Sequence, residues 1–145
     1  MENSFCSAPN PVLRVLLVGD PHRCGGPFMG WLWDQGGCVI AGPAVTLAGT
    51  LALAVEFQPD VVILDFYGLA EPIGKVLKFL KELVPRTKVF ALTHELNHAW
   101  RRRCEAMGVD AVFHKTEEFD ELAAALVALR LDKPRSSPRF TSVPQ

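Results

Sequence analysis

Short apolar runs alternate along this chain with longer segments whose apolar residues recur at helical spacing. The runs lie at 14–18, 38–41, 61–64, 88–92 and 111–113. They are rich in Val, Leu and Ile and have few polar residues between the apolar ones. Uninterrupted runs of this length predict strands that are buried on both faces of a sheet.

The segments between and after these runs predict helices. They lie at 28–35, 46–57, 71–84, 95–107 and 116–131. Stop signals follow the first four: Gly36 after the first, Pro59 and Pro85 after the next two, and Gly108 as the C-cap of the fourth. Thr116 is expected to cap the last helix.

A strand followed by a helix therefore occurs five times in succession. Such alternation predicts an α/β fold in which helices cover both faces of a doubly wound, five-stranded parallel sheet. We expect residues 1–11 to be a flexible leader, because they contain Ser, Asn and two prolines, and 12–131 to be the folded domain. Residues 132–145, with their Ser, Pro and Arg, should be a flexible tail.

Composition narrows the functional classes. The chain has 145 residues, of which 49% are hydrophobic and 21% charged, as expected for one globular domain. The net charge of −1 gives no overall basic field, so we expect no direct contact with nucleic acid. No signal peptide or membrane-spanning stretch is evident, which favours a cytoplasmic location without a membrane contact. The four cysteines lack Cys-x-x-Cys spacing, which argues against a zinc site or a disulfide framework.

Four polar residues each follow a separate predicted strand: Asp20, Asp65, Thr93 and Lys115. The carboxyl ends of parallel strands meet at one edge of a doubly wound sheet, where such folds bind ligands. We therefore expect the four side chains to lie close together. Simpler interpretations remain open: Asp20 before Pro21 is also a helix N-cap, Thr93 is also a cap for the next helix, and Lys115 is also a surface lysine.

The segments that carry these residues resemble the receiver domain of two-component response regulators. They are Val-Gly-Asp ending at 20, Asp-Val-Val-Ile-Leu-Asp at 60–65, Phe-Ala-Leu-Thr at 90–93 and Gly-Val-Asp-Ala-Val-Phe-His-Lys at 108–115. The resemblance covers the chain from about 12 to 129. It implies the flavodoxin-like fold with strand order 2-1-3-4-5.

The resemblance also implies a chemistry. Asp65 would accept a phosphoryl group from a histidine kinase, a phosphotransfer protein or a small donor such as acetyl phosphate. Asp20, Asp65 and the backbone carbonyl of Tyr67 would hold Mg²⁺, which prefers oxygen ligands. Thr93 and Lys115 would contact the phosphoryl oxygens. The protein would not be an enzyme, apart from catalysing its own phosphorylation and dephosphorylation.

Several positions depart from the family's pattern. Gly19 replaces the second acid after the first strand, so we expect weaker Mg²⁺ binding. Gly68-Leu69 replaces Met-Pro, and His94 replaces a small residue. Val112 stands where the family has its switch aromatic, and the neighbouring Phe113 should point to the other face of its strand.

Two hypotheses for the output follow. The first is a stand-alone phosphoacceptor that contacts a downstream protein, with a possible homodimer through the fourth helix, fifth strand and fifth helix. The second is a pseudo-receiver that binds partners without phosphorylation. We interpret Arg101-Arg102-Arg103 as a solvated face and the basic residues at the C-terminal end as a solvated tail. Those basic residues are Arg130, Lys133, Arg135 and Arg139.

A cobalamin-binding module is a remote third alternative. The segment at 20–25 fits Asp-x-His-x-x-Gly, in which His22 would be the cobalt ligand. The Ser-x-Leu and Gly-Gly segments of that module are missing at 65–67 and 93–94.

Overall fold

The computed structural model describes residues 12–20, 27–65, 72–93, 97–114 and 117–133. Within them the elements alternate between strand and helix, as predicted. In chain order they are β1 (Leu13–Val18), α3 (Pro27–Gln35), β2 (Cys38–Ala44), α4 (Leu47–Phe57), β3 (Val61–Asp65), α5 (Ile73–Leu83), β4 (Lys88–Thr93), α6 (His98–Ala106), β5 (Ala111–His114) and α7 (Phe119–Asp132). The limits expected for a leader and a tail stay predictions, because residues 1–11 and 134–145 lie outside the described residues.

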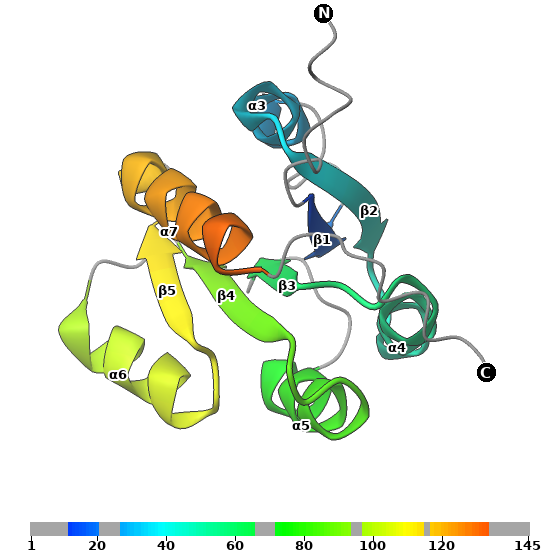
Figure 1. Cartoon of the computed structure of the whole chain (residues 1–145). Helices are drawn as coiled ribbons and strands as arrows, with labels where there is room; N and C mark the ends of the chain where they lie inside the picture. The colour runs from blue at the N-terminus through cyan, green and yellow to red at the C-terminus, as the bar shows by residue number, and fades with distance from the viewer. Residues whose placement is uncertain (1–11, 21–26, 66–71, 94–96, 115–116, 134–145) are drawn as a thin grey trace, which may run out of the picture.

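The strands of the described residues form one five-stranded sheet in the order β2-β1-β3-β4-β5, and every neighbouring pair is parallel. The predicted fold class and strand order are confirmed. Figure 1 shows the resulting layers, with α3 and α7 on one face of the sheet and α4, α5 and α6 on the other. All five strands point the same way, so their carboxyl ends share one edge.

A core lies on each face of the sheet, and β3 contributes to both. Val62 and Leu64 belong to the apolar cluster under α4, α5 and α6, whereas Val61 and Ile63 belong to the cluster under α3 and α7. All four are fully buried. Each such side chain stabilises the fold by about 1.5–3 kcal/mol. This two-sided burial explains the uninterrupted apolar run in the sequence.

The start of α6 differs from the prediction. The helix begins at His98, and the side-chain oxygen of Asn97 accepts from the backbone N–H groups of Ala99 (2.7 Å) and Trp100 (3.3 Å). A cap of this kind stabilises a helix by about 1 kcal/mol. Thr93 belongs to β4, so the alternative interpretation of Thr93 as the helix cap is wrong.

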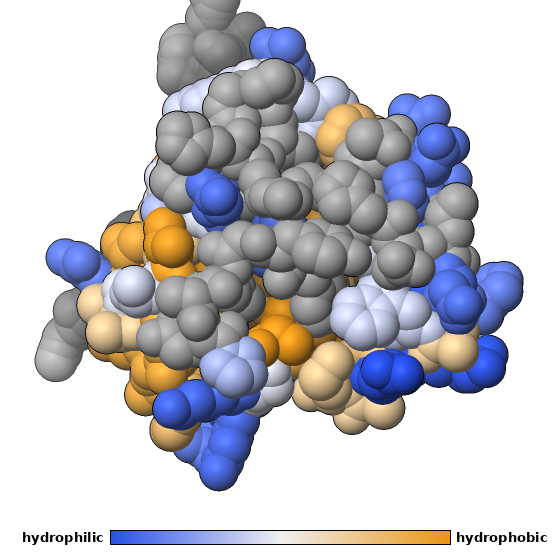
Figure 2. Space-filling view, turned by 180° about the vertical axis from the view of Figure 1, so that it is seen from behind, coloured by the Kyte–Doolittle hydropathy of each residue, from blue (hydrophilic) through white to orange (hydrophobic). Residues whose placement is uncertain are grey.

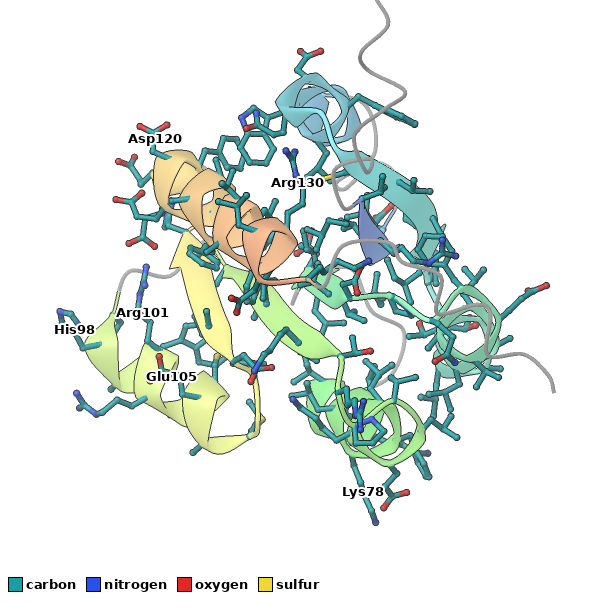
Figure 3. The ribbon with its side chains drawn as sticks, in the orientation of Figure 1. Lys78, His98, Arg101, Glu105, Asp120 and Arg130 are labelled. Carbon is teal, nitrogen blue, oxygen red and sulfur yellow. The ribbon has the colours of Figure 1, made fainter. Side chains whose placement is uncertain are left out.

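Two basic residues near the C-terminal end contact the folded body. A guanidinium N–H of Arg130 donates to the carbonyl of Gly36 at 3.3 Å. Figure 3 shows this side chain between α7 and α3. The ammonium group of Lys133 donates to the carbonyl of Val12 at 2.8 Å and to the carboxylate of Asp60 at 2.9 Å. For Arg130 and Lys133 the interpretation as a solvated tail is therefore wrong, while Arg135 and Arg139 lie outside the described residues.

The surface is uneven in polarity. Seen from behind in Figure 2, apolar side chains gather on the side of α4, and hydrophilic ones gather on the side of α6 and α7. Val55 of α4 and Leu83 of α5 are 51% and 47% exposed. No helix in the described part of the chain combines the length and the apolar character that crossing a bilayer needs.

Candidate functional site

Asp65 and Thr93 end two neighbouring strands at the carboxyl edge of the sheet. Asp65 is the last residue of β3 and Thr93 the last of β4. Asp65 pairs in register with Leu92, which places Thr93 one residue further along the adjacent strand. Adjacent strands lie about 4.8 Å apart. Both side chains are fully buried, so a carboxyl and a hydroxyl group lie at two adjacent strand ends of this edge.

Asp20 reaches the same edge from the other side of β3. Val18 ends β1 and pairs in register with Leu64, so the residues that follow β1 lie beside the end of β3. The N–H of Gly19 donates to the carbonyl of Ala44 at 2.8 Å, which holds this connection against β2. Asp20 follows and is half-buried.

Gly19 has a physical reason to be glycine. Its φ is +148°, in the range of positive φ that side chains with a Cβ rarely adopt. An acid at this position, as in the receiver pattern, would require a different backbone. This edge therefore offers the carboxylates of Asp20 and Asp65 without the third acid that the family pattern carries.

Two of the predicted site residues, Lys115 and Tyr67, lie outside the described residues, as does His94. The structure shows how the connection to Lys115 begins. His114 ends β5 and pairs in register with Thr93. The ring Nδ1 of His114 accepts from the N–H of Glu117 at 3.0 Å, so the two sides of this short connection are joined by a hydrogen bond. The roles of Lys115 and Tyr67 stay predictions.

Trp100 is a residue at this site that sequence reasoning missed. Its indole N–H donates to the hydroxyl oxygen of Thr93 at 2.9 Å. The side chain is half-buried and packs against the apolar cluster under α4, α5 and α6. The sequence signal was present: an aromatic residue with a donor in the first turn of the helix that follows the strand ending at Thr93.

The side chains of β5 take the faces that the sequence predicted. Val112 belongs to the cluster under α4, α5 and α6, and Phe113 belongs to the cluster on the opposite face. Phe113 packs edge-to-face on Phe90, with 5.4 Å between ring centroids. In the described part of this site, the aromatic group that contacts Thr93 therefore comes from α6.

The prediction of a solvated face at 101–103 does not hold for Arg101. Its guanidinium group forms an ion pair with Glu118 and donates to the carbonyl of Val112 at 3.1 Å. Figure 3 shows this side chain reaching from α6 towards the start of α7. The interpretation as a solvated face is wrong for Arg101, whereas Arg102 and Arg103 are exposed.

Glu118 connects three elements of the fold, and α7 begins later in the chain than predicted. One carboxylate oxygen accepts from the backbone N–H of His114 at 2.7 Å and from Arg101. Burial opposes the charge of Glu118, but the bonds from Arg101 and His114 outweigh it, so the pKa of Glu118 lies below its ordinary value. Glu118 occupies the N-cap position of a helix that begins at Phe119, and the predicted start at Thr116 is wrong.

The donor set suits a hard cation. In the described residues there is no group of three or more His, Cys, Asp and Glu side chains that could hold a metal ion. Asp20 and Asp65 supply two carboxylates at one edge, and Mg²⁺ commonly binds through one or two carboxylates while it keeps several waters. The residues present therefore fit Mg²⁺ better than a metal that needs a closed protein cage.

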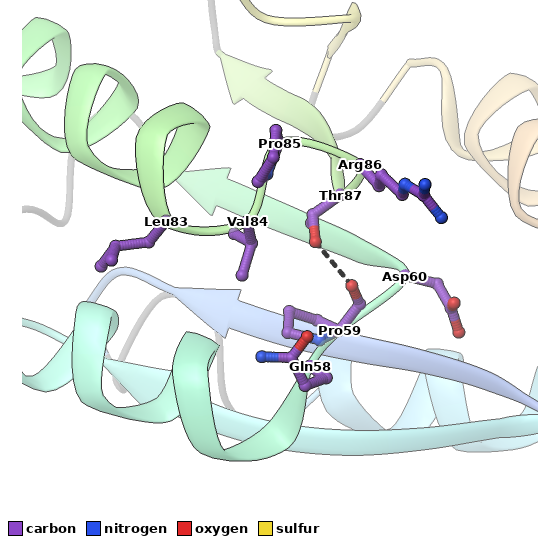
Figure 4. A pocket seen from close by; sticks show the side chains of 8 residues that line it. All are labelled: Gln58, Pro59, Asp60, Leu83, Val84, Pro85, Arg86 and Thr87. Carbon is purple, nitrogen blue, oxygen red and sulfur yellow. Dashed lines mark hydrogen bonds between the residues drawn. The ribbon is translucent and has the colours of Figure 1, made fainter. Parts of the chain in front are cut away.

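A hollow of about 400 Å³ lies at the opposite edge of the sheet, where β3 and β4 begin. Figure 4 shows its lining, in which the hydroxyl of Thr87 donates to the carbonyl of Pro59 at 2.7 Å. This bond ties the turn after α5 to the turn after α4. The hollow shares no residue with the candidate site.

No protein-family model matches the chain. A Pseudomonas aeruginosa protein named "Putative transcriptional regulator" is 32% identical over 117 residues, which make up 80% of this chain and 56% of that protein. The chain thus spans little more than half the length of this relative.

Solved structures extend the comparison. A two-component response regulator of the LuxR family from Aurantimonas sp. SI85-9A1 superposes with a TM-score of 0.72 at 17% identity, covering 90% of this chain and 93% of that one. A chemotaxis response regulator of Vibrio cholerae gives 0.66 at 20% identity, covering 81% and 98%. A Burkholderia pseudomallei response regulator, with a phosphorylated aspartic acid, a calcium ion and citrate, gives 0.66 at 19% identity, covering 79% and 66%.

The cobalamin alternative stays a prediction, because His22 and Gly25 lie outside the described residues. The strand order, the cores on both faces and these superpositions agree with one another. The chain has the flavodoxin-like fold of a response regulator receiver domain.

Proposed function

We propose that this protein accepts a phosphoryl group on Asp65 and passes the signal on by protein contact. The observation that carries the proposal is the burial of Asp65 at the end of β3, beside Thr93 of β4. Burying an ionisable group costs folding stability, and proteins tolerate that cost mainly where the group has a task. Asp20 at the adjacent strand end adds the second carboxylate that a phosphoryl-transfer site needs.

The transfer itself is a displacement at phosphorus. A carboxylate oxygen of Asp65 forms the new P–O bond, while the bond from phosphorus to the imidazole nitrogen of phosphohistidine, or to the acyl oxygen of acetyl phosphate, breaks. The leaving group takes that electron pair. Thr93 donates its hydroxyl proton in a hydrogen bond to a phosphoryl oxygen, and Lys115 pairs with another. Asp20, Asp65 and the carbonyl of Tyr67 would hold Mg²⁺, which would neutralise charge on the phosphoryl oxygens.

The partners in this proposal are a histidine kinase or phosphotransfer protein upstream and a protein target downstream. The relative from Pseudomonas aeruginosa leads us to include control of transcription among the outputs. Contact with a target, or with a second copy of the chain, would involve the face formed by α6, β5 and α7. That face carries the Arg101–Glu118 ion pair, so a change at the strand ends has a direct connection to it.

Acetyl-phosphate labelling tests the proposal. The full-length protein should gain the mass of one phosphoryl group in the presence of Mg²⁺, and Asp65→Asn should gain none. Asp20→Asn, which leaves the acceptor in place, should be labelled more slowly at the same Mg²⁺ concentration. If the wild-type protein stays unlabelled and beryllofluoride with Mg²⁺ leaves its amides unchanged, the pseudo-receiver function replaces the phosphoacceptor function.

A further inference from the structure

The hydrogen bond between Trp100 and Thr93 sets the direction in which the hydroxyl group of Thr93 can donate. An indole N–H is a donor and never an acceptor, whereas a threonine hydroxyl has one proton and two lone pairs. At 2.9 Å from the indole nitrogen, the oxygen of Thr93 must act as the acceptor. Its own proton therefore points away from Trp100, towards a different acceptor.

Trp100 is also fixed to the rest of α6. It lies in the first turn, where its backbone N–H donates to the capping oxygen of Asn97 at 3.3 Å. The next residue, Arg101, bonds to the carbonyl of Val112 and to Glu118. Glu118 in turn accepts from the N–H of His114. These bonds connect the first turn of α6 to β5 and to the start of α7.

From these contacts we infer that Trp100 is the positioning residue through which the state of Thr93 reaches α6. The inference rests on the proposed function, because it takes the phosphoryl group on Asp65 as the acceptor for the Thr93 proton. A hydroxyl that donates to a charged oxygen becomes a stronger acceptor, so the bond from Trp100 tightens when the phosphoryl group is present. The indole then follows Thr93, and the first turn of α6 moves with it.

This inference assigns the residue that couples to Thr93 to helix α6 and not to strand β5. Val112, at the position of the family's switch aromatic, has neither a ring nor a donor, and Phe113 is buried on the other face. Trp100 supplies both a ring and a donor from α6. The competing explanation is that Trp100 only packs against the core, in which case its N–H bond would be indifferent to the state of Asp65.

Nuclear magnetic resonance of the indole N–H groups distinguishes the two explanations in the full-length protein. The chain has three tryptophans, Trp31, Trp33 and Trp100, and single substitutions to Phe assign their signals. Addition of beryllofluoride and Mg²⁺ should shift the Trp100 indole signal to lower field. The Trp33 signal is the internal control, because this side chain is 58% exposed on α3, on the far side of the sheet. Asp65→Asn should abolish the Trp100 shift.

The outcomes separate this inference from the proposed function. If the amides of β3 and β4 respond while the Trp100 indole stays still, the inference is overturned and the phosphoacceptor function stands. Equal shifts of all three indoles would also overturn it, since they would report a general change. If nothing responds, the proposed function fails and the inference fails with it.

Labelling rates give a second readout that packing alone would not reproduce. Trp100→Phe keeps the ring but loses the donor. We expect acetyl-phosphate labelling to slow by at most about fivefold, the full net strength of one ordinary hydrogen bond, because only the tightening of the bond during transfer affects the rate. Thr93→Val should slow labelling at least as much, and Thr93→Ser, which keeps the hydroxyl, should restore it. Trp33→Phe should label at the wild-type rate. A Trp100→Phe protein that labels normally and keeps the beryllofluoride shifts of its α6 amides would overturn the inference.

Discussion

The ion pair between Arg101 and Glu118 should make the stability of the protein depend on pH in a defined way. Replacing Glu118 by Gln removes the charge but keeps an oxygen that can accept from the N–H of His114. At neutral pH the variant loses the charge-assisted part of the bond to Arg101. The two side chains are 20% and 28% exposed, so solvent screens the pair only in part. We expect the free energy of unfolding to fall by about 1 kcal/mol.

The sign of the pH dependence follows from the pKa of Glu118, which lies below its ordinary value of 4.5 in the folded state. A group of this kind stabilises the fold fully above the unfolded-state pKa. It loses that contribution as the pH falls through the lower folded-state pKa. The difference in stability between the wild-type protein and Glu118→Gln should therefore be constant above about pH 5 and shrink steadily in more acidic solution.

Urea denaturation at a series of pH values measures this difference. Glu121→Gln is the matched control, because Glu121 is an exposed acid in the first turn of the same helix and should contribute only a few tenths of a kcal/mol through the helix dipole. A double-mutant cycle with Arg101→Gln isolates the pair. Equal stability of Glu118→Gln and the wild-type protein at pH 7, or a difference that persists unchanged in acid, would refute the reasoning.

Further substitutions test other parts of the structure by urea denaturation. Gly37→Ala should lower the free energy of unfolding by about 2 kcal/mol, because Gly37 has a φ of +72° and a Cβ there would displace the guanidinium of Arg130. Gly30→Ala lies in open space within α3 and should instead raise the free energy of unfolding by about 1 kcal/mol. Thr46→Ala removes the 3.0 Å cap bond of α4 and should cost about 1 kcal/mol, with no loss at all arguing against that cap.

Much of the candidate site was accessible from the sequence because position along a strand and position in the sheet are linked in this fold. An apolar run that ends in Asp65 and another that ends in Thr93 must bring those residues to one edge once the strands are parallel and adjacent. The departures at Gly19 and Val112 were visible in the same way. The sequence did not reveal why Gly19 is glycine, since its φ of +148° is a property of the folded backbone.

The sequence by itself determined the order of strands and helices, the two-sided burial of the sheet and the set of polar residues at the strand ends, because all of these follow from local periodicity. Only the tertiary structure decided which side chains hold that edge together. The bonds from Trp100 to Thr93, from Arg101 to Glu118 and from Lys133 to Asp60 join side chains of different elements. The distance and angle at which the helices pack on the sheet determine which side chains meet. No local pattern in the sequence predicts that geometry.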